Sequence, residues 1–284
     1  MSTELEFKKT MRKRRQKQKN RRNLIIALFS LFIIIVLVIC VKSIFSQNEK
    51  TSDDTQFIFN GYIYPEPPQK NPDILIDAQN PDGKKVAYLT FDDGPNNSVT
   101  IEVLDILRKY NIKATFFLVG SLIEKNPDAA RRLYDEGHLL ANHSYTHQYS
   151  ELYATKESFM NQINQTQLLI NKITNDNNYP KIMRFPGGSY NAGSHGAAKQ
   201  EYKRALEAEG FRYCDWNSLT GDSEIKNATS DMLMQRFKSS SNGKEDLVIL
   251  MHDTISKKIT PDTLPELIEY LISEGYSFDT LDNI

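Results

Sequence analysis

The chain after Lys85 alternates between short β-rich runs and helical patterns, and this alternation constrains the fold most. Apolar residues within the helical patterns recur at the spacing of one helix face. About seven strand–helix alternations imply parallel strands with helices outside them, an α/β barrel-like fold. The expected strands cover 86–91, 114–119, 139–142, 182–185, 211–216, 247–251 and 277–281, and the helical patterns cover 101–107, 129–134, 159–173, 202–206, 232–237 and 264–272.

Polar residues lie at the ends of several of these expected strands. In barrels of this kind the active site is assembled at the carboxyl ends of the strands. Residues scattered at random would not fall at these ends so consistently, so we predict a common site there. Its candidates are Asp92 and Asp93 after the first strand, His143 after the third, Arg184 on the fourth, Asp215 on the fifth and His252 after the sixth.

Two histidines four residues apart, His143 and His147, indicate a metal site. Both imidazoles can point the same way from one tight loop, and a carboxylate completes a facial N,N,O set that leaves positions open for water. An open position indicates catalysis, and the second aspartate of the pair at 92–93 is then available as a base. Taken alone, the two histidines could equally be surface or capping residues.

The amino-terminal part of the chain has the pattern of a membrane anchor. Residues 23–41 carry no charge, and about 20 such residues cross a bilayer as a helix. Ten basic residues precede this run, which by the positive-inside rule places the amino terminus in the cytoplasm. A cleaved signal peptide is the alternative, but the run is long and no small-residue cleavage site follows. We predict a single-pass protein of the cell membrane with a cytoplasmic tail (1–22), a transmembrane helix (23–42), an extracellular stem (43–85) and an extracellular catalytic domain (86–284).

Charge is distributed unevenly along the chain. Of 35 basic and 36 acidic residues, 11 basic and 2 acidic ones precede residue 43, which leaves 24 basic against 34 acidic. A net charge near −10 argues against nucleic acid as a partner of the outer part and is compatible with a neutral or cationic polymer. Cys214 is the single cysteine of this part, so no disulfide can form within it. The stem is rich in Asn, Asp, Gln and Pro, and we expect short strands near 57–64.

Five sequence blocks in order resemble the polysaccharide deacetylase family, the NodB-homology domain of carbohydrate esterase family 4. The resemblance covers about residues 86–284. It implies a distorted (β/α) barrel of about seven strands and one divalent metal ion, usually Zn²⁺ with Co²⁺ as another possibility. It also implies removal of N- or O-acetyl groups from cell-wall or related glycans. The blocks are Thr-Phe-Asp-Asp-Gly at 90–94, His-Ser-Tyr-Thr-His at 143–147, Arg-Phe-Pro-Gly-Gly at 184–188, Asp-Trp-Asn at 215–217 and Leu-Met-His at 250–252.

Carried onto this chain, the resemblance implies that Asp93, His143 and His147 hold the metal. Asp92 would then deprotonate the attacking water. A cation next to Asp92 keeps the carboxylate ionised and lowers the pKa of the water toward neutrality. Arg184 would pair with Asp92 and orient it, with a surface salt bridge as the alternative interpretation.

The resemblance also assigns the groups around the acetyl carbonyl. The backbone N–H of Gly187 would stabilise the oxyanion. His252 would protonate the leaving amine, with Asp215 bonded to its other ring nitrogen, although a histidine after an apolar run is more often structural. Leu250 and Trp216 resemble the apolar wall around the acetyl methyl group, and either residue is equally compatible with the core.

These observations favour a membrane-anchored, outward-facing deacetylase of N-acetylglucosamine in peptidoglycan. No protein partner is implied. Within the family the alternatives are enzymes acting on N-acetylmuramic acid, chitooligosaccharide, an exopolysaccharide or acetylxylan. A non-catalytic glycan-binding protein on the same fold is the alternative from another class, and the intact set of candidate residues argues against it.

Overall fold

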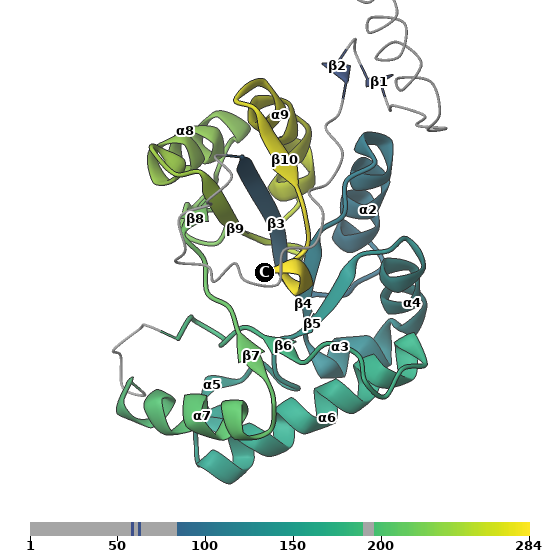
Figure 1. Ribbon diagram of the computed structural model, residues 1–284, viewed down its shortest axis with the longest axis vertical. Helices are drawn as coiled ribbons and strands as arrows, with labels where there is room; N and C mark the ends of the chain where they lie inside the picture. The colour runs from purple at the N-terminus through teal and green to yellow at the C-terminus, as the bar shows by residue number, and fades with distance from the viewer. Residues whose placement is uncertain (1–57, 60–61, 64–83, 190–195) are drawn as a thin grey trace, which may run out of the picture. The chain divides into compact units, whose positions relative to one another are not determined.

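The computed structural model describes residues 58–59, 62–63, 84–189 and 196–284 (Figure 1). Within the predicted stem, β1 (Ile58–Phe59) and β2 (Tyr62–Ile63) pair in antiparallel fashion, which confirms the short strands expected there. The predicted tail and transmembrane helix lie outside the described residues. Among the helices that are described, none has both the length and the apolar character needed to cross a membrane.

A parallel sheet organises the chain from residue 84 onward. The strand order is β7-β6-β5-β4-β3-β9-β8, and β10 pairs with the first residues of β3. The sheet curls with helices around its outer side, as Figure 1 shows. In the described chain β7 and β8 end the order, so the predicted barrel is an open, curled sheet. The strands are β3 (Lys85–Gly94), β4 (Thr115–Leu118), β5 (Leu139–Asn142), β6 (Ile182–Met183), β7 (Arg212–Tyr213), β8 (Ser218–Leu219), β9 (Asp246–His252) and β10 (Tyr276–Phe278).

The helices follow the predicted patterns, with three short elements in addition. Thr155 and Thr229 begin two of the helices by accepting a hydrogen bond from a backbone N–H three residues on, a cap that stabilises a helix by ~1 kcal/mol. The additional elements are α3, α5 and the final 3₁₀ turn, each too short to show a helical period. The helices are α2 (Val99–Tyr110), α3 (Gly120–Lys125), α4 (Pro127–Asp135), α5 (Tyr149–Leu152), α6 (Lys156–Thr174), α7 (Gly196–Ala208), α8 (Ser230–Ser241) and α9 (Ile259–Ser273), followed by η1 (Leu281–Asn283).

The central strand β3 has two buried faces with different tasks. Because side chains alternate along a strand, Leu89 and Phe91 point toward the helices and belong to the main core. Val86 and Tyr88 point into the curl of the sheet and pack in a second cluster with residues such as Phe117. Truncating a large side chain in such a core costs ~2–5 kcal/mol. The inward face of β3 continues toward its carboxyl end, where it supplies the site described below.

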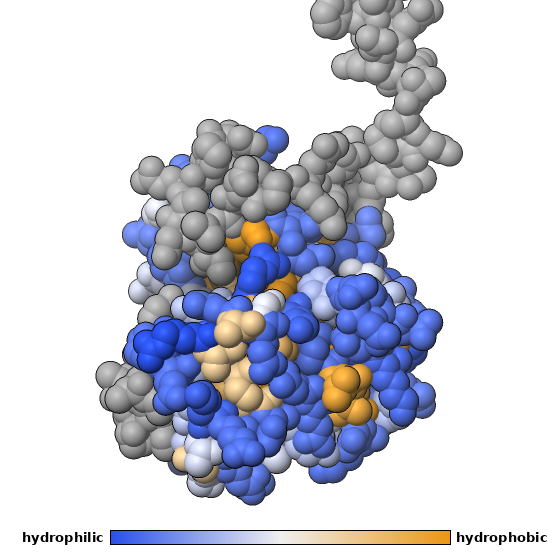
Figure 2. All heavy atoms as spheres, turned by 60° about the horizontal axis from the view of Figure 1, so that its bottom comes forward, coloured by the Kyte–Doolittle hydropathy of each residue, from blue (hydrophilic) through white to orange (hydrophobic). Residues whose placement is uncertain are grey.

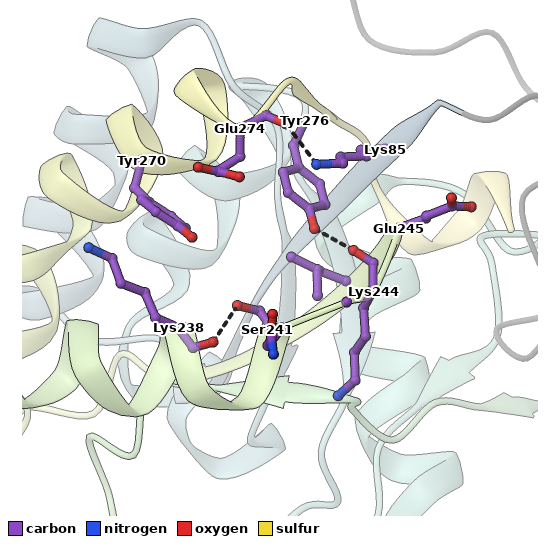
Figure 3. A pocket seen from close by; sticks show the side chains of 11 residues that line it. Lys85, Lys238, Ser241, Lys244, Glu245, Tyr270, Glu274 and Tyr276 are labelled. Atoms are coloured by element: carbon purple, nitrogen blue, oxygen red, sulfur yellow. Dashed lines mark hydrogen bonds between the residues drawn. The ribbon is translucent and has the colours of Figure 1, made fainter.

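A hollow of about 300 Å³ lies at the opposite end of the sheet, beside the first residues of β3 and β9 (Figure 3). The ammonium of Lys85 donates to the carbonyl of Glu274 at 3.0 Å, and Lys244 donates to the carbonyl of Ser240 at 2.6 Å. These carbonyls belong to the ends of α9 and α8, where a cation also faces the negative end of the helix dipole. Lys85 and Lys244 therefore complete helix ends and stabilise the fold.

The surface of the described chain carries few exposed large apolar side chains. Figure 2 shows one face of the molecule, on which apolar residues form small separate spots in a mainly hydrophilic surface. The exposed large apolar residues are Tyr149, Leu168, Met232 and Ile255. Of these, Tyr149 lies at the candidate site.

We predict that His138 makes the stability of the fold depend on pH. Its buried Nδ1 accepts from the N–H of Ala114 at 3.2 Å, and burial lowers the pKa of His138 to about 3. The unfolded chain, with a pKa of about 6.5, binds a proton that the folded chain does not, so stability falls as the pH drops from about 6.5 toward 3. His138→Asn keeps an acceptor oxygen but cannot be protonated. Its free energy of unfolding should be lower at neutral pH and fall less steeply below about pH 6.5.

Urea unfolding of the metal-free protein at several pH values tests this prediction. Every other titrating group is common to the two proteins, so its contribution cancels in the comparison. Equal slopes for wild type and His138→Asn would contradict the assignment.

Candidate active site and metal centre

The predicted polar residues meet at the carboxyl ends of the parallel strands. Asp92 and His252 are register partners on the adjacent strands β3 and β9. Arg184 follows β6 and reaches the carboxylate of Asp92, and His143 follows β5 and lies beside the same aspartate pair. The expectation that these strand ends share a site is therefore met by the geometry.

A break in the regular strand turns both aspartates toward the site. Consecutive residues of a strand normally face opposite sides. Here the pairing of β3 with β4 shifts register between Asp92 and Gly94, and Asp93 has a φ of 75°. Aspartate tolerates this left-handed conformation better than most residues. The bulge lets a buried base and a metal ligand stand next to each other in the sequence.

The loop that follows this bulge is anchored by Asp253. Its carboxylate accepts from the hydroxyl of Thr100 at 2.5 Å, and its carbonyl accepts from the side chain of Asn96 at 2.6 Å. A Cβ on Gly94 would lie 2.6 Å from one carboxylate oxygen of Asp253, so the close approach requires glycine. Burial and the negative charges of Asp93 and Asp92 together raise the pKa of Asp253 to about 7, although the hydrogen bond from Thr100 lowers it.

Asp93, His143 and His147 have the geometry of a metal triad. Their candidate ligand atoms all lie within 4.8 Å of one another. Oδ1 of Asp93 lies 3.2 Å from Nε2 of His147 and 3.5 Å from Nε2 of His143. Two ligands at ~2.1 Å from a tetrahedral ion lie about 3.4 Å apart. That oxygen is buried without a hydrogen-bond partner among the described residues, so the three residues fit one divalent ion such as zinc or cobalt.

The environment of His143 fixes a neutral ring that presents Nε2 to the triad. Nδ1 lies 2.9 Å from the carbonyl of Arg184, to which its N–H donates. Burial lowers the pKa of His143 to about 3. A neutral imidazole held by its other nitrogen is the usual form of a metal-binding histidine. The short distances from His143 to Asp92 and Asp93 are therefore contacts of a neutral ring and do not represent ion pairs.

Asp92 is buried and paired with Arg184. The guanidinium donates from Nη1 to Oδ1 of Asp92 at 2.8 Å, and it lies over the ring of Phe117 at 4.1 Å. Burial raises the pKa of Asp92, while the charge and hydrogen bond of Arg184 oppose the rise. Because Arg184 is 0% exposed, the alternative of a surface salt bridge is wrong. The raised pKa makes Asp92 a stronger base than an exposed carboxylate.

The partner of His252 is Asp222, and the predicted bond from Asp215 is wrong. Nδ1 of His252 donates to Oδ1 of Asp222 at 2.9 Å, and the backbone N–H of His252 donates to Oδ2 at 2.7 Å. Thr260 donates a third hydrogen bond to this buried carboxylate. Burial of the ring opposes its charging, but the hydrogen bond and charge of Asp222 outweigh burial and raise the pKa of His252 to about 9.

The short strand β8 explains this correction. The predicted strand at 211–216 is reduced to β7, which pairs with β6 at the far edge of the sheet, so Asp215 stays there. The chain then returns as β8, which pairs with β9, and Asp222 follows β8 beside the end of β9. A two-residue strand leaves no period in the sequence, so Asp222 had no detectable signal apart from its place in a polar loop.

Asp215 instead holds the loop that follows β6. Its carboxylate accepts from the backbone N–H of Ser189 at 2.7 Å and from the hydroxyl of the same residue. Its carbonyl accepts from Nη2 of Arg184 at 3.0 Å. This loop carries Gly187, the predicted oxyanion donor, so Asp215 supports the site at a different place from the one predicted.

Aromatic residues line the loop that carries Gly187. Gly187 has a φ of 74°, and a Cβ on it would lie 2.6 Å from the hydroxyl of Tyr149. Tyr149 is 44% exposed and contacts His147 edge-on at 5.7 Å; its nearness to the metal triad was not predicted. Trp216 lies over the guanidinium of Arg184 at 5.7 Å, and Leu250 is buried on β9. The roles of Gly187, Trp216 and Leu250 toward a substrate stay predictions.

Known proteins share both the sequence and the fold of this chain. The family model described as polysaccharide deacetylase matches residues 79–205. A peptidoglycan-N-acetylglucosamine deacetylase of Listeria monocytogenes is 35% identical over 201 residues, which are 71% of this chain and 39% of that protein. The similarity therefore spans well under half of the Listeria protein.

Two further relatives are matched over most of their length. A peptidoglycan-N-acetylglucosamine deacetylase of Bacillus cereus is 32% identical, with 69% of each chain covered. The crystal structure of the catalytic domain of a peptidoglycan N-acetylglucosamine deacetylase from Eubacterium rectale is 32% identical, with a TM-score of 0.65 over 74% of this chain and 94% of that domain. On this evidence, the chain belongs to the polysaccharide deacetylase family.

Proposed function

We propose that this protein is a metal-dependent deacetylase that hydrolyses the N-acetyl group of N-acetylglucosamine units in peptidoglycan or a related cell-wall glycan. The observation that carries this proposal is the convergence of Asp93, His143 and His147 beside a buried aspartate that is paired with Arg184. The names of the relatives from Listeria, Bacillus and Eubacterium support the substrate class.

The residues around the triad divide the chemistry of amide hydrolysis between them. A divalent cation held by the triad would polarise the acetyl carbonyl and lower the pKa of a bound water. Asp92 takes a proton from the water while the oxygen of the water bonds to the acetyl carbonyl carbon. The N–H of Gly187 donates to the oxygen on which negative charge develops.

His252 supplies the second proton transfer. With a pKa of about 9 it is protonated at neutral pH, so it can give its proton to the amide nitrogen as the C–N bond breaks. The products are acetate and a free amine on the sugar. Asp222 keeps the ring charged and fixes its orientation through Nδ1.

We also propose that residues 23–42 anchor the enzyme in the membrane with its catalytic domain outside. The uncharged run at 23–41 and the ten basic residues before it support this orientation. An anchored domain on a polar stem suits a substrate in the wall.

Acetate release tests the proposed activity. The full-length protein in detergent is incubated with peptidoglycan, chitooligosaccharide or acetylxylan, and acetate is measured by mass spectrometry. We expect release from peptidoglycan, loss of release on chelation and recovery with zinc or cobalt. The His143→Ala variant should bind no metal. The control variant His138→Asn changes a buried histidine outside the site and should still bind the metal. Full activity of the chelated protein would exclude the metal-dependent mechanism. Acetate release from chitooligosaccharide or acetylxylan alone would assign the enzyme a substrate other than peptidoglycan.

The pH dependence of turnover tests the pairing of His252 with Asp222. The acid must be protonated, so the alkaline limb reflects its pKa. Asp222→Asn removes a negative charge, which lowers the pKa of His252 and should move that limb down by ~1–2 pH units. Asp215→Asn serves as the matched control, because its carboxylate bonds Ser189, and the limb should stay in place. A limb that moves with Asp215→Asn and stays with Asp222→Asn would refute the pairing.

Removal of the base should affect turnover without affecting metal binding. Asp92→Asn keeps the shape of the side chain but cannot accept the proton, so turnover should fall by ~10²- to 10⁴-fold. Metal content, measured by elemental analysis, should match that of the wild type. A variant with near-normal turnover would assign the base elsewhere.

Protease accessibility tests the membrane orientation. Protease added to wall-stripped intact cells should digest the part after Lys42 and spare the amino-terminal tail, as read with antibodies to each part. Protection of the catalytic domain would contradict the orientation.

A further inference from the structure

Every peptide unit of the loop from Pro186 to Ser189 is held by a hydrogen bond. The N–H of Gly188 donates to the carbonyl of Phe185 at 2.7 Å. The carbonyl of Gly188 accepts from the ammonium of Lys199 at 2.6 Å, and the N–H of Ser189 donates to Asp215. The remaining unit, between Pro186 and Gly187, is the one whose N–H the proposed mechanism uses.

That remaining peptide unit is held by Tyr153. The hydroxyl of Tyr153 donates to the carbonyl of Pro186 at 2.8 Å. A peptide bond is planar, and this one is trans, so its carbonyl and its N–H point in opposite directions. Fixing the carbonyl of Pro186 toward the buried tyrosine therefore aims the N–H of Gly187 away from the aromatic core.

The tyrosine itself is rigidly placed. It is buried, and its ring stacks on Phe159 at 6.1 Å and on Tyr202 at 6.0 Å, with interplanar angles of 17° and 13°. The ring also meets Tyr149 edge-on at 5.8 Å and has the ammonium of Lys199 5.1 Å from its centre, so its hydroxyl has a fixed position. Such rigidity matters here because a donor stabilises developing charge well only when it is already oriented.

The glycine makes this external support necessary. Gly187 has no side chain and a φ of 74°, so local sterics restrict its backbone less than that of any other residue. Without a hydrogen bond on the carbonyl of Pro186, the peptide plane could rotate within the freedom that glycine allows. A donor on that carbonyl also polarises the amide and strengthens the N–H as a donor.

We infer that Tyr153 is a positioning residue for the oxyanion donor: its hydroxyl sets the direction of the Gly187 N–H through the carbonyl of Pro186. The inference rests on the proposed function, because that function gives the N–H its role. Tyr153 acts through the peptide and does not touch the reacting atoms. Lys199 and Asp215 hold the neighbouring peptide units, so loss of the tyrosine hydroxyl should loosen one unit and leave the loop in place.

The test compares Tyr153→Phe with Tyr202→Phe. Each variant removes one hydroxyl from the same aromatic cluster, but Tyr202 donates to the carbonyl of Tyr153 and not to the loop. Loss of a whole oxyanion donor costs ~10²- to 10³-fold in kcat. Misdirection of one should cost less, so we expect Tyr153→Phe to lower kcat by ~5- to 50-fold with KM, metal content and the unfolding midpoint near those of wild type. Tyr202→Phe should keep the kcat of wild type.

A second substrate separates positioning from general damage. A trifluoroacetyl group in place of the acetyl group stabilises the oxyanion through its own fluorines, so the defect of Tyr153→Phe should shrink on that substrate. Equal defects on both substrates, or a Tyr153→Phe variant that matches Tyr202→Phe, would overturn the inference while the wild type remained active. A wild type that releases no acetate with metal present would overturn the proposed function and this inference with it.

Discussion

The buried guanidinium of Arg184 is the interaction on which the rest of the site depends. The guanidinium donates to the carbonyls of Cys214 and Asp215, to the hydroxyl of Thr90 and to the carboxylate of Asp92. The backbone carbonyl of Arg184 accepts from the ring of His143. A buried charge without partners costs several kcal/mol, so these contacts must all be present together. One residue thus couples the base, a metal ligand and the strands that carry them. Removing it would leave Asp92 without this partner, and burial would then raise the pKa of the carboxyl further and favour its protonated form.

The site gathers negative charge in a buried place, which prepares it for a cation. Burial raises the pKa of Asp253, and Asp93 and Asp92 lie close enough that their negative charges add to this rise. Arg184 and His252 offset part of this charge, and the triad leaves one aspartate oxygen without a hydrogen bond among the described residues. A divalent ion would relieve the remaining repulsion, so its binding and the ionisation of the carboxylates support each other.

Much of the fold and of the site follows from sequence patterns that extend over several residues. The strand ends identified Asp92, Asp93, His143 and Arg184, because a buried strand leaves an apolar run that stops at its polar end. Asp222 escaped detection because β8 is two residues long and because its pairing with β9 joins segments about thirty residues apart. Tyr153 escaped as well, since its ring lies in an aromatic cluster and only its hydroxyl reaches the loop. Local sequence patterns reveal helices and strands, whereas contacts between segments far apart in the sequence are seen only in the folded structure.

The alternation of β3 has a consequence for how this strand can vary. Its odd-numbered residues fill the core against the helices, and its even-numbered residues lead to the base. Deleting or inserting one residue of the strand before Asp92 would exchange its two faces. The carboxylate of Asp92 would then point toward the helices, and the ring of Phe91 would point toward the site. The strand can therefore accept exchanges of one apolar side chain for another. Its length cannot change, because the number of residues before Asp92 determines which side chains face the core and which face the site.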